Sequence, residues 1–243
     1  MHALYESLAP WWPLLSPAED YEAEAEVYLG LLTAARNGVS PDSLLELGSG
    51  AGHLASHLPA TVDVELLDLA EGMLSVSQSL NPSRTHHRQD MRSAKLPRTF
   101  EAVLLHDAVM YLLTEADLAA TLAVAAAHLS PGGAVLVVPD VVSETFEPLT
   151  QAGGHDGPDG RGARMLEWHW DPDPSDTRFS VEMSVLLRSA DGTVQAVHET
   201  HEMGLFSRRT FVRLLREAGL EPLPPDPFLA VSCGEVFVAR KPD

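Results

Sequence analysis

Three glycines at alternate positions limit most strongly what this chain can fold into. Gly48, Gly50 and Gly52 follow the short apolar run Ser43–Leu47 and precede the helix-like segment HLASHL. Glycine lacks a Cβ atom, so its backbone can turn sharply and approach a ligand closely. A dinucleotide loop of the form G-x-G-x-x-G would need a glycine where His53 stands. The run therefore predicts a strand–turn–helix unit that binds a ligand of another kind.

Short apolar runs alternate with helical patterns through the first half of the chain. Ser16-Pro17-Ala18-Glu19 has the form of a capping box, which predicts a helix from there to Arg36. We expect further strands at 62–69, 85–90, 100–106 and 133–139, and further helices at 71–79 and 115–129. Pro131-Gly132-Gly133 is expected to end the last helix. The alternation predicts an α/β fold, with a parallel sheet between helices and ligands at the carboxyl ends of the strands.

Beyond Pro139 the pattern changes to strand-like alternation. Leu166, Trp168 and Trp170 are expected on one face of a strand, with Glu167 and His169 on the other. Two further strands are expected at 179–187 and 194–203, joined by a hairpin turn at Asp191-Gly192. The segment 153–162, rich in glycine, is expected to be its flexible part. These strands predict a small antiparallel sheet, in which the tryptophans cover the sheet.

The C-terminal segment returns to the α/β pattern. Ser207 is a candidate cap for a helix that ends at Gly219, and 235–240 has the composition of a last strand. The single cysteine, Cys233, excludes an internal disulfide, and we expect it to be buried and structural.

Charge and hydropathy exclude several classes of function. Acidic residues outnumber basic residues 35 to 16, which gives a formal net charge of −19. Such a chain would repel a phosphate backbone, so no nucleic-acid partner is expected. No apolar run approaches the roughly 20 residues of a membrane helix, and the start MHALYESLAP lacks the pattern of a signal peptide. We therefore expect a cytoplasmic protein with no membrane partner.

The glycine loop resembles that of the class I S-adenosylmethionine-dependent methyltransferases. With Glu46 it reads E-x-G-x-G-x-G. Across the whole chain, the layout is most similar to that of nucleotide-linked amino-sugar N-methyltransferases. The similar segments are LYESLAPWW, EDYEAEA, QDMR, HLSPGG, PDVVSETF and LFSRRTF.

The resemblance implies a Rossmann-like, seven-stranded class I methyltransferase sheet with helices on both faces and a small antiparallel β insertion. A single domain, 1–243, is expected. Its parts would be an N-terminal helical cap (1–42), a cofactor-binding core (43–142), an antiparallel substrate-side insertion (143–206) and a C-terminal helix with the last core strands (207–243).

The same resemblance implies S-adenosyl-L-methionine as cofactor. Asp68 ends the second strand, where a carboxylate can accept hydrogen bonds from both ribose hydroxyls. Asp90 and Met91 match the adenine-binding segment, and Tyr5 and Tyr21 would close over the cofactor. The full set of expected cofactor residues is Tyr5, Tyr21, Glu46, Gly48, Ser49, Gly50, Gly52, Asp68, Leu69, Met73, Asp90, Met91 and His106.

Methyl transfer is an in-line displacement at carbon, so positioning is the main contribution of the protein. His106, at the end of the fourth strand, is the first candidate base, and Asp107 could orient it or the acceptor. His169 could reach the cleft from the insertion. Trp11, Tyr111, Trp168 and His201 are candidate substrate-binding residues. The expected partner is a small-molecule methyl acceptor, and a homodimer stays open.

Three functions fit these residues. The first is N-methylation of an amine or amino sugar. The second is O-methylation of a small hydroxylated or carboxylated metabolite, which magnesium could assist at Asp107 and Asp140, although no third ligand is evident. The third is a non-enzymatic S-adenosylmethionine-binding sensor or scaffold. No metal site is expected, because strand alternation sends His198 and His201 to opposite faces.

Overall fold

The computed structural model describes residues 2–224 and 235–243, and Cys233 lies outside them. A seven-stranded sheet has the order β10-β11-β5-β4-β1-β2-β3, and a four-stranded antiparallel sheet has the order β6-β7-β8-β9. The larger sheet consists of β1 (Ser43–Leu47), β2 (Asp63–Asp68), β3 (Thr85–Arg88), β4 (Phe100–His106), β5 (Leu129–Val138), β10 (Glu221–Leu223) and β11 (Phe237–Arg240). The smaller sheet consists of β6 (Leu149–Gly153), β7 (Gly162–Trp170), β8 (Arg178–Arg188) and β9 (Val194–Gly204).

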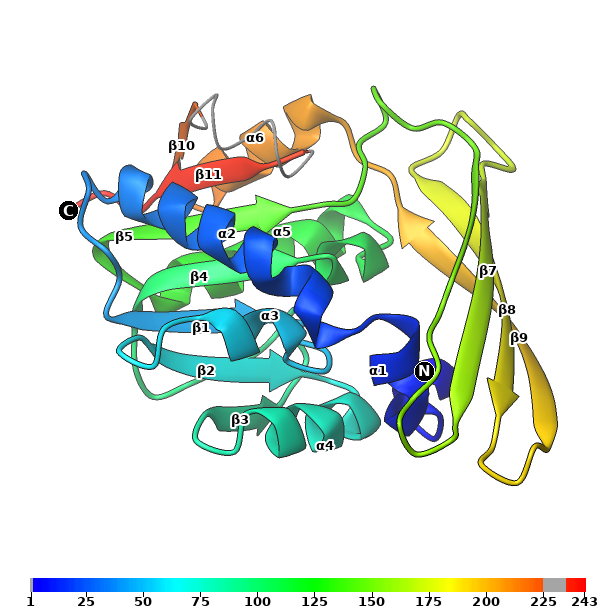
Figure 1. The fold of residues 1–243 in the computed structure, drawn as a ribbon. Helices are drawn as coiled ribbons and strands as arrows, with labels where there is room; N and C mark the ends of the chain where they lie inside the picture. Colours follow the sequence, from blue (N-terminus) through cyan, green and yellow to red (C-terminus); the bar gives the residue numbers. More distant parts are fainter. Residues whose placement is uncertain (1, 225–234) are drawn as a thin grey trace.

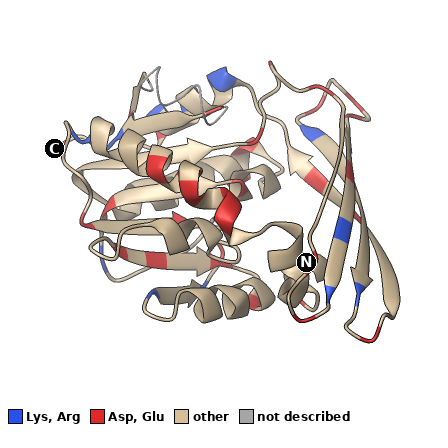
Figure 2. Ribbon diagram, in the orientation of Figure 1, with Lys and Arg blue, Asp and Glu red and all other residues tan. Residues whose placement is uncertain are grey.

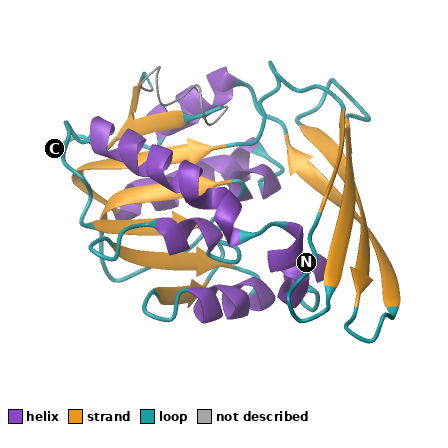
Figure 3. Cartoon of the chain, viewed as in Figure 1, coloured by secondary structure: helices purple, strands orange, loops and turns teal. Residues whose placement is uncertain are grey.

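Helices cover both faces of the large sheet (Figure 3). They are α2 (Glu22–Ala35), α3 (His53–His57), α4 (Glu71–Leu80), α5 (Glu115–His128) and α6 (Arg208–Glu217), with the short α1 (Trp12–Leu15) near the N-terminus. Single 3-10 turns are η1 (Ala3–Tyr5), η2 (Ala9–Trp11), η3 (Ala18–Tyr21) and η4 (Ala108–Tyr111). The predicted fold class, including the antiparallel insertion, is confirmed.

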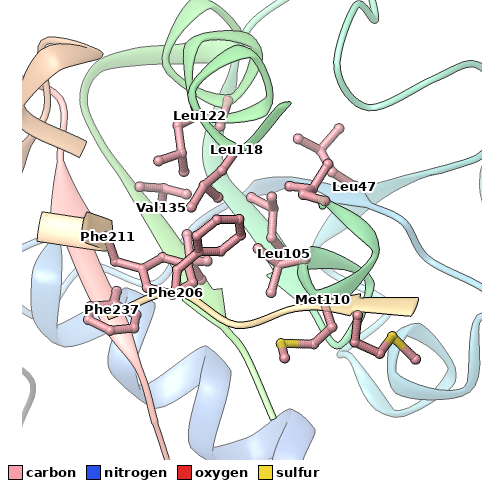
Figure 4. Packing of buried hydrophobic residues seen from close by; sticks show 14 of the residues in the cluster. Leu47, Leu105, Met110, Leu118, Leu122, Val135, Phe206, Phe211 and Phe237 are labelled. Carbon is pink, nitrogen blue, oxygen red and sulfur yellow. The ribbon is translucent and has the colours of Figure 1, made fainter. Parts of the chain in front are cut away.

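Strand alternation divides the core into two layers. Leu44, Leu66, Leu104 and Leu136 pack with α2 and α3, whereas their neighbours along the strands pack on the opposite face. That opposite layer holds Leu47, Leu105 and Val135 against Leu118 and Leu122 of α5 and Phe211 of α6 (Figure 4). Because both faces are apolar, the central strands are nearly continuous hydrophobic runs, as parallel strands usually are.

The direction of the strands decides where a ligand can bind. β1, β2, β3, β4 and β5 run parallel, so their carboxyl ends lie along one edge. The small sheet stands across that edge, and the N-terminal segment lies between the two sheets (Figure 1). The edge is therefore covered from two sides by segments distant in sequence.

Several local predictions were wrong or incomplete. Ser16 does not cap a helix: its hydroxyl hydrogen-bonds the hydroxyl of Tyr21, and the chain enters α2 through η3. Pro131-Gly132-Gly133 does not end α5, because that helix ends at His128 and the three residues lie inside β5. The edge strands β6 and β10 were not predicted. By contrast, the predicted cap at Ser207 is confirmed, since its Oγ accepts from the Thr210 N–H.

The two faces of β7 were assigned the wrong environments. Trp168 is 49% exposed and its ring stacks on Trp170 at 5.7 Å, so the tryptophan face is the outer face of the small sheet. Glu167 is largely buried and influences the ionisation of Asp140, beyond the end of β5. The polar face of β7, which carries Glu167 and His169, is therefore the one turned toward the large sheet.

Candidate active site

A cavity of about 430 Å³ lies at the carboxyl ends of the parallel strands, a size typical of small-molecule sites. Most of the expected cofactor residues line it: Tyr5, Tyr21, Glu46, Gly48, Ser49, Gly50, Asp68, Leu69, Met73, Asp90, Met91 and His106. Asp107, Tyr111 and Trp12 line it too. A wider surface hollow of about 950 Å³, beside residues 92–99 and α5, contains none of the glycine-loop residues.

The glycine loop is held tightly against its neighbours. Gly48, Gly50 and Gly52 all have positive φ, at 75°, 52° and 70°, a conformation that L side chains rarely adopt. A Cβ atom on Gly48 would lie 2.2 Å from the Cβ of Ala108, and one on Gly52 would lie 2.2 Å from the Ser77 hydroxyl. Gly48 and Gly52 are therefore required by close packing as well as by backbone conformation, and Gly50 by its conformation.

Asp68 is fixed in place by the backbone on both sides of it. One carboxylate oxygen accepts from the Gly50 N–H and the other from the Ala70 N–H, each at 2.8 Å. The side chain also lines the cavity, so the remaining lone pairs are available to a ligand. This geometry suits a bidentate acceptor for two adjacent hydroxyl groups.

The end of the cavity at Asp90, where adenine is expected, contains an ion pair that the sequence did not predict. Arg92 donates to both carboxylate oxygens of Asp90 and also to Asp117. These hydrogen bonds hold the pKa of Asp90 below its usual range. The carboxylate is thus ionised and fixed, as an acceptor for an exocyclic amine must be.

Glu46 is the residue whose environment most requires a ligand. Its side chain is buried, and one carboxyl oxygen has no hydrogen-bond partner among the described residues. Burial raises the pKa of Glu46 to about 7. The hydroxyl of Ser49 in the same loop is also buried without a partner. Unpaired buried polar groups are costly, so both groups favour a polar ligand in the cavity.

His106 lies among three carboxyl groups. Its Nε2 is 3.0 Å from Asp107 and 3.4 Å from Glu24, and Glu46 is also close enough to affect it. Burial opposes protonation, but these carboxyl groups outweigh it and raise the pKa of His106 to about 9. At neutral pH the ring is therefore an imidazolium, which cannot accept a proton. This charge favours a hydrogen-bond-donating His106 over the base that was expected from the sequence.

Asp107 has a strained backbone, with φ of 53° and ψ of −47°. A non-glycine residue in this conformation costs about 1–3 kcal/mol and is concentrated at functional sites. Burial disfavours the charged form of Asp107, but His106 more than offsets this and lowers its pKa. Asp140 shares a hydrogen bond with Asp107, and burial beside that carboxylate raises the pKa of Asp140. The pair is best described as an ionised Asp107 and a protonated Asp140.

Five expected site residues do not line the cavity. Gly52 faces Ser77 and Asn81 of the protein itself. His201 lies one layer behind it, where its Nδ1 is 2.9 Å from the hydroxyl of Tyr111. His169 pairs with Glu167 at 3.4 Å on the inner face of the small sheet. Trp11 packs against Arg161 outside the cavity, and Trp168 lies on the outer face.

The site residues expected from the sequence do not include His2, Glu24 or Glu199. A signal for Glu24 was present, because Tyr21, Glu24 and Tyr28 fall on one face of a helix at spacings of three and four. Trp12 adjoins the predicted Trp11 and lines the cavity in its place. Nothing in the sequence pairs His2 with Glu199, because their contact joins the N-terminal segment to the distant strand β9.

Comparison with known proteins identifies this architecture. Residues 44–133 match a family model described as a methyltransferase domain. The chain is 32% identical to dTDP-3-amino-3,6-dideoxy-alpha-D-glucopyranose N,N-dimethyltransferase of Streptomyces fradiae, over 83% of this chain and 78% of the relative. It is also 32% identical to dTDP-3-amino-3,4,6-trideoxy-alpha-D-glucopyranose N,N-dimethyltransferase of Streptomyces venezuelae, over 85% and 86%.

The chain belongs to the S-adenosylmethionine-dependent amino-sugar N-methyltransferase family. Among solved structures, DesVI of Streptomyces venezuelae is 28% identical, covers 92% of each chain and has a TM-score of 0.78. CalS10, described as an amino pentose methyltransferase of Micromonospora echinaspora, is 25% identical, covers 91% of each chain and has a TM-score of 0.74. CalS10 was solved with S-adenosylmethionine bound. The protein is therefore a small-molecule methyltransferase that uses S-adenosylmethionine.

The cavity of this methyltransferase fits that cofactor. Asp68 offers two oxygens suited to ribose hydroxyls, Asp90 an ionised acceptor suited to adenine, and Glu46 a buried polar atom without a partner. Gly48 and Gly50 of the loop line this cavity.

Asp68→Ala should weaken S-adenosylmethionine binding by about 1–3 kcal/mol, because it removes two acceptor oxygens and the anchor of the Gly50 N–H. Isothermal titration calorimetry measures this directly. Asp63→Ala, at the exposed opposite end of the same strand, is the matched control and should bind normally. An unchanged affinity for Asp68→Ala would remove this residue from the site.

His106 should also make stability depend on pH. Because its pKa is raised from about 6.5 to about 9 in the folded protein, its stabilising effect is complete below pH 6.5 and is lost as the pH rises through 9. The free energy of unfolding should therefore fall by on the order of 3 kcal/mol over this interval.

Urea unfolding of wild type and His106→Gln at several pH values tests this. The variant should be less stable than wild type near pH 6, and the two curves should converge above pH 9. His198→Gln, which removes a 62% exposed histidine, should follow the wild-type curve. Parallel curves for wild type and His106→Gln would contradict the imidazolium assignment.

Proposed function

We propose that this enzyme transfers methyl groups to the amino nitrogen of an amino sugar. The observation that carries the proposal is the charge of one end of the cavity, at Tyr5, Asp107 and Tyr111. We call this the acceptor end. Asp107, Glu167 and Glu199 act electrostatically on this end, through Tyr5, Tyr111 or Asp140. Arg92 is the single Lys or Arg among the described lining residues, and it is occupied by Asp90 and Asp117.

An anionic site of this kind selects a cationic acceptor. An amine is an ammonium ion at neutral pH, so it would be attracted to the ionised Asp107, whose side chain is 50% accessible. A neutral hydroxyl gains less from this field, and a carboxylate is repelled. Acidic residues are spread over both sheets (Figure 2), which is consistent with attraction of a cation from solution.

The protein's contribution to the reaction is positional and electrostatic. S-adenosylmethionine, when bound, supplies an electrophilic methyl group, and the N–C bond forms as the C–S bond breaks and its electron pair stays on sulfur. Asp107 can accept an N–H hydrogen bond from the acceptor and so fix the direction of its lone pair. The imidazolium of His106 keeps Asp107 ionised for this purpose. The strained backbone of Asp107 is consistent with such a role.

We infer the sugar class from the relatives, whose names specify 3-amino sugars linked to dTDP. The other expectations stand as proposals: no nucleic-acid partner, a location in the cytoplasm and a homodimer. The net charge of −19 supports the first. The exposed Leu166, Trp168 and Leu186 of the small sheet offer an apolar surface for the last, which sedimentation velocity can test. Among the described residues, no helix has the length and apolar character needed to cross a membrane.

The test is to incubate the enzyme with S-adenosylmethionine and dTDP-3-amino-3,6-dideoxy-α-D-glucopyranose. Mass spectrometry should show a product with one or two added methyl groups, together with S-adenosylhomocysteine. The matched control substrate carries a hydroxyl in place of the amine, and we expect no methylated product from it.

The alternatives predict different results in the same assay. Methylation of the hydroxyl compound, abolished by a chelator and restored by magnesium, would favour O-methylation. Cofactor binding without any methylated product, across a panel of amino sugars and other amines, would favour a sensor or scaffold.

A further inference from the structure

A chain of hydrogen bonds leads from the acceptor end of the cavity to the surface beside the N-terminus. We propose that Tyr5, Tyr111, His201 and Glu199 form a proton-transfer chain that carries the proton of the acceptor amine out of the site. The proposal rests on the proposed function, because an amine acceptor is an ammonium ion at neutral pH and must lose a proton before its lone pair can attack. It gives these residues a joint role in the reaction.

The links of the chain are continuous. The hydroxyl groups of Tyr5 and Tyr111 are hydrogen-bonded to each other, and both side chains line the cavity. The Tyr111 hydroxyl is 2.9 Å from His201 Nδ1, and His201 Nε2 is 2.9 Å from a carboxylate oxygen of Glu199. His201 is fully buried. Because it contacts both Tyr111 and Glu199 directly, no bridging water is needed between the cavity and Glu199. The residues come from η1, η4 and β9, which the fold brings together from distant parts of the sequence.

The outer end of the chain reaches solvent. The Glu199 side chain is 13% exposed, and His2 beside it is 32% exposed. The Ala3 N–H donates to Glu199 at 2.8 Å, and the His2 ring stacks on His201 with centroids 3.6 Å apart. The N-terminal segment therefore fixes the outlet of the chain, in the position between the sheets seen in Figure 1.

The direction of transfer follows from the chemistry of the links. A carboxylate can only accept, so His201 donates from Nε2 to Glu199 and accepts from Tyr111 at Nδ1. When the ammonium gives a proton to the Tyr5 oxygen, Tyr5 gives its own to Tyr111, and Tyr111 gives its own to His201. Nε2 then releases a proton to Glu199, which returns it to water. Each link gains one proton and loses one, so only the amine changes its charge.

Burial supports transfer without a charged tyrosine. It raises the pKa of both Tyr5 and Tyr111 above the usual range, so neither phenol exists as a stable anion. Each phenol must therefore pass on one proton as it receives another. Glu199 lies beside His201, where it can accept the proton that Nε2 releases.

The same corner of the molecule could suggest a metal site instead. One potential ligand atom from each of His2, Glu199 and His201 lies within 4.8 Å of the others. However, the two imidazole rings are stacked with an interplanar angle of 29°, so their nitrogen lone pairs run side by side and do not converge on one ion. The hydrogen bonds of His201 on both nitrogens favour proton transfer.

The first test is the pH profile of kcat/KM with the dTDP-3-amino sugar above. The variants are Tyr111→Phe, His201→Asn and Glu199→Gln, and the control is His198→Asn. His198 is a matched control because it lies on the same strand and also pairs with a glutamate, Glu182 at 2.9 Å, but on the outer face. Normal S-adenosylmethionine binding shows that each variant is folded.

The loss of kcat/KM in the three variants should depend on pH. Near pH 7 the acceptor is protonated, and a substitution that breaks the proton-transfer chain should lower kcat/KM by on the order of 10²-fold. Near the pKa of the amine the deficit should shrink, because the acceptor then arrives without its proton. The groups that face His201 are Tyr5, Tyr111, His2, Glu199 and Glu167. All of them are unchanged in the His198→Asn control. The pH profile of kcat/KM for this control should therefore superimpose on that of wild type. A deficit equal at every pH, or none, would overturn the proposal.

The second test does not need an acceptor. Long-range ¹H–¹⁵N NMR of the histidine rings, with S-adenosylmethionine present, reports which nitrogen of His201 carries the proton. We expect the Nε2–H tautomer, and Tyr111→Phe should shift the Nδ1 resonance of His201 but not that of His198. An Nδ1–H tautomer would block transfer from Tyr111 and overturn the proposal, as would activity that depends on added zinc. If wild type methylates no amino sugar, the proposed function fails. The NMR measurement still shows whether His201 has the tautomer that the proton-transfer chain requires.

Discussion

The close contact of the glycine loop with Ala108 and Ser77 is the constraint on which the site depends. A Cβ atom at Gly48 or Gly52 would lie 2.2 Å from these neighbours. The loop can therefore bring β1, the turn after β4 and helix α4 together only because glycine occupies those positions. Asp68 completes the arrangement, since its two oxygens hold the Gly50 and Ala70 N–H groups from the adjacent strand. The cofactor cavity is a consequence of this packing.

Electrostatics then divides the cavity into two parts with different chemistry. At the end where adenine is expected, Arg92 pairs with both Asp90 and Asp117. At the acceptor end the carboxyl groups outnumber the cations, and His106 is the buried positive charge that keeps Asp107 ionised. Two carboxyl groups that share a hydrogen bond do not readily ionise together, which explains why the pKa of Asp140 is raised beside the ionised Asp107. The acceptor end thus holds a net negative charge that an ammonium ion would balance.

The sequence predicted the elements whose patterns are local. The glycine spacing, the alternating apolar runs and Asp68 at a strand end were enough for the fold class and the cofactor cavity. The capping box at Ser16 failed because the Tyr21 hydroxyl competes for the serine side chain. The face of β7 was misassigned because alternation shows that two faces differ but not which one is covered. The short edge strands β6 and β10 carry too few residues to give a pattern.

Contacts between distant segments could not be predicted. The pairing of Ala3 with Glu199 spans 196 residues, and that of Tyr111 with His201 spans 90. No periodicity links such positions, because they meet only when the small sheet folds across the edge of the large one. The pKa of His106 likewise depends on Glu24, from a helix on one face of the sheet, and on Asp107 together. Residue roles at the acceptor end therefore changed more on inspection of the structure than those at the cofactor end.

A crystal structure with S-adenosylhomocysteine bound is the most direct measurement of the central claim. The account predicts ribose hydroxyls on Asp68, adenine beside Asp90, and the sulfur atom facing the acid-lined space near Asp107 and the Tyr5–Tyr111 pair. A sulfur atom turned away from Asp107, or a ligand bound outside this cavity, would contradict it.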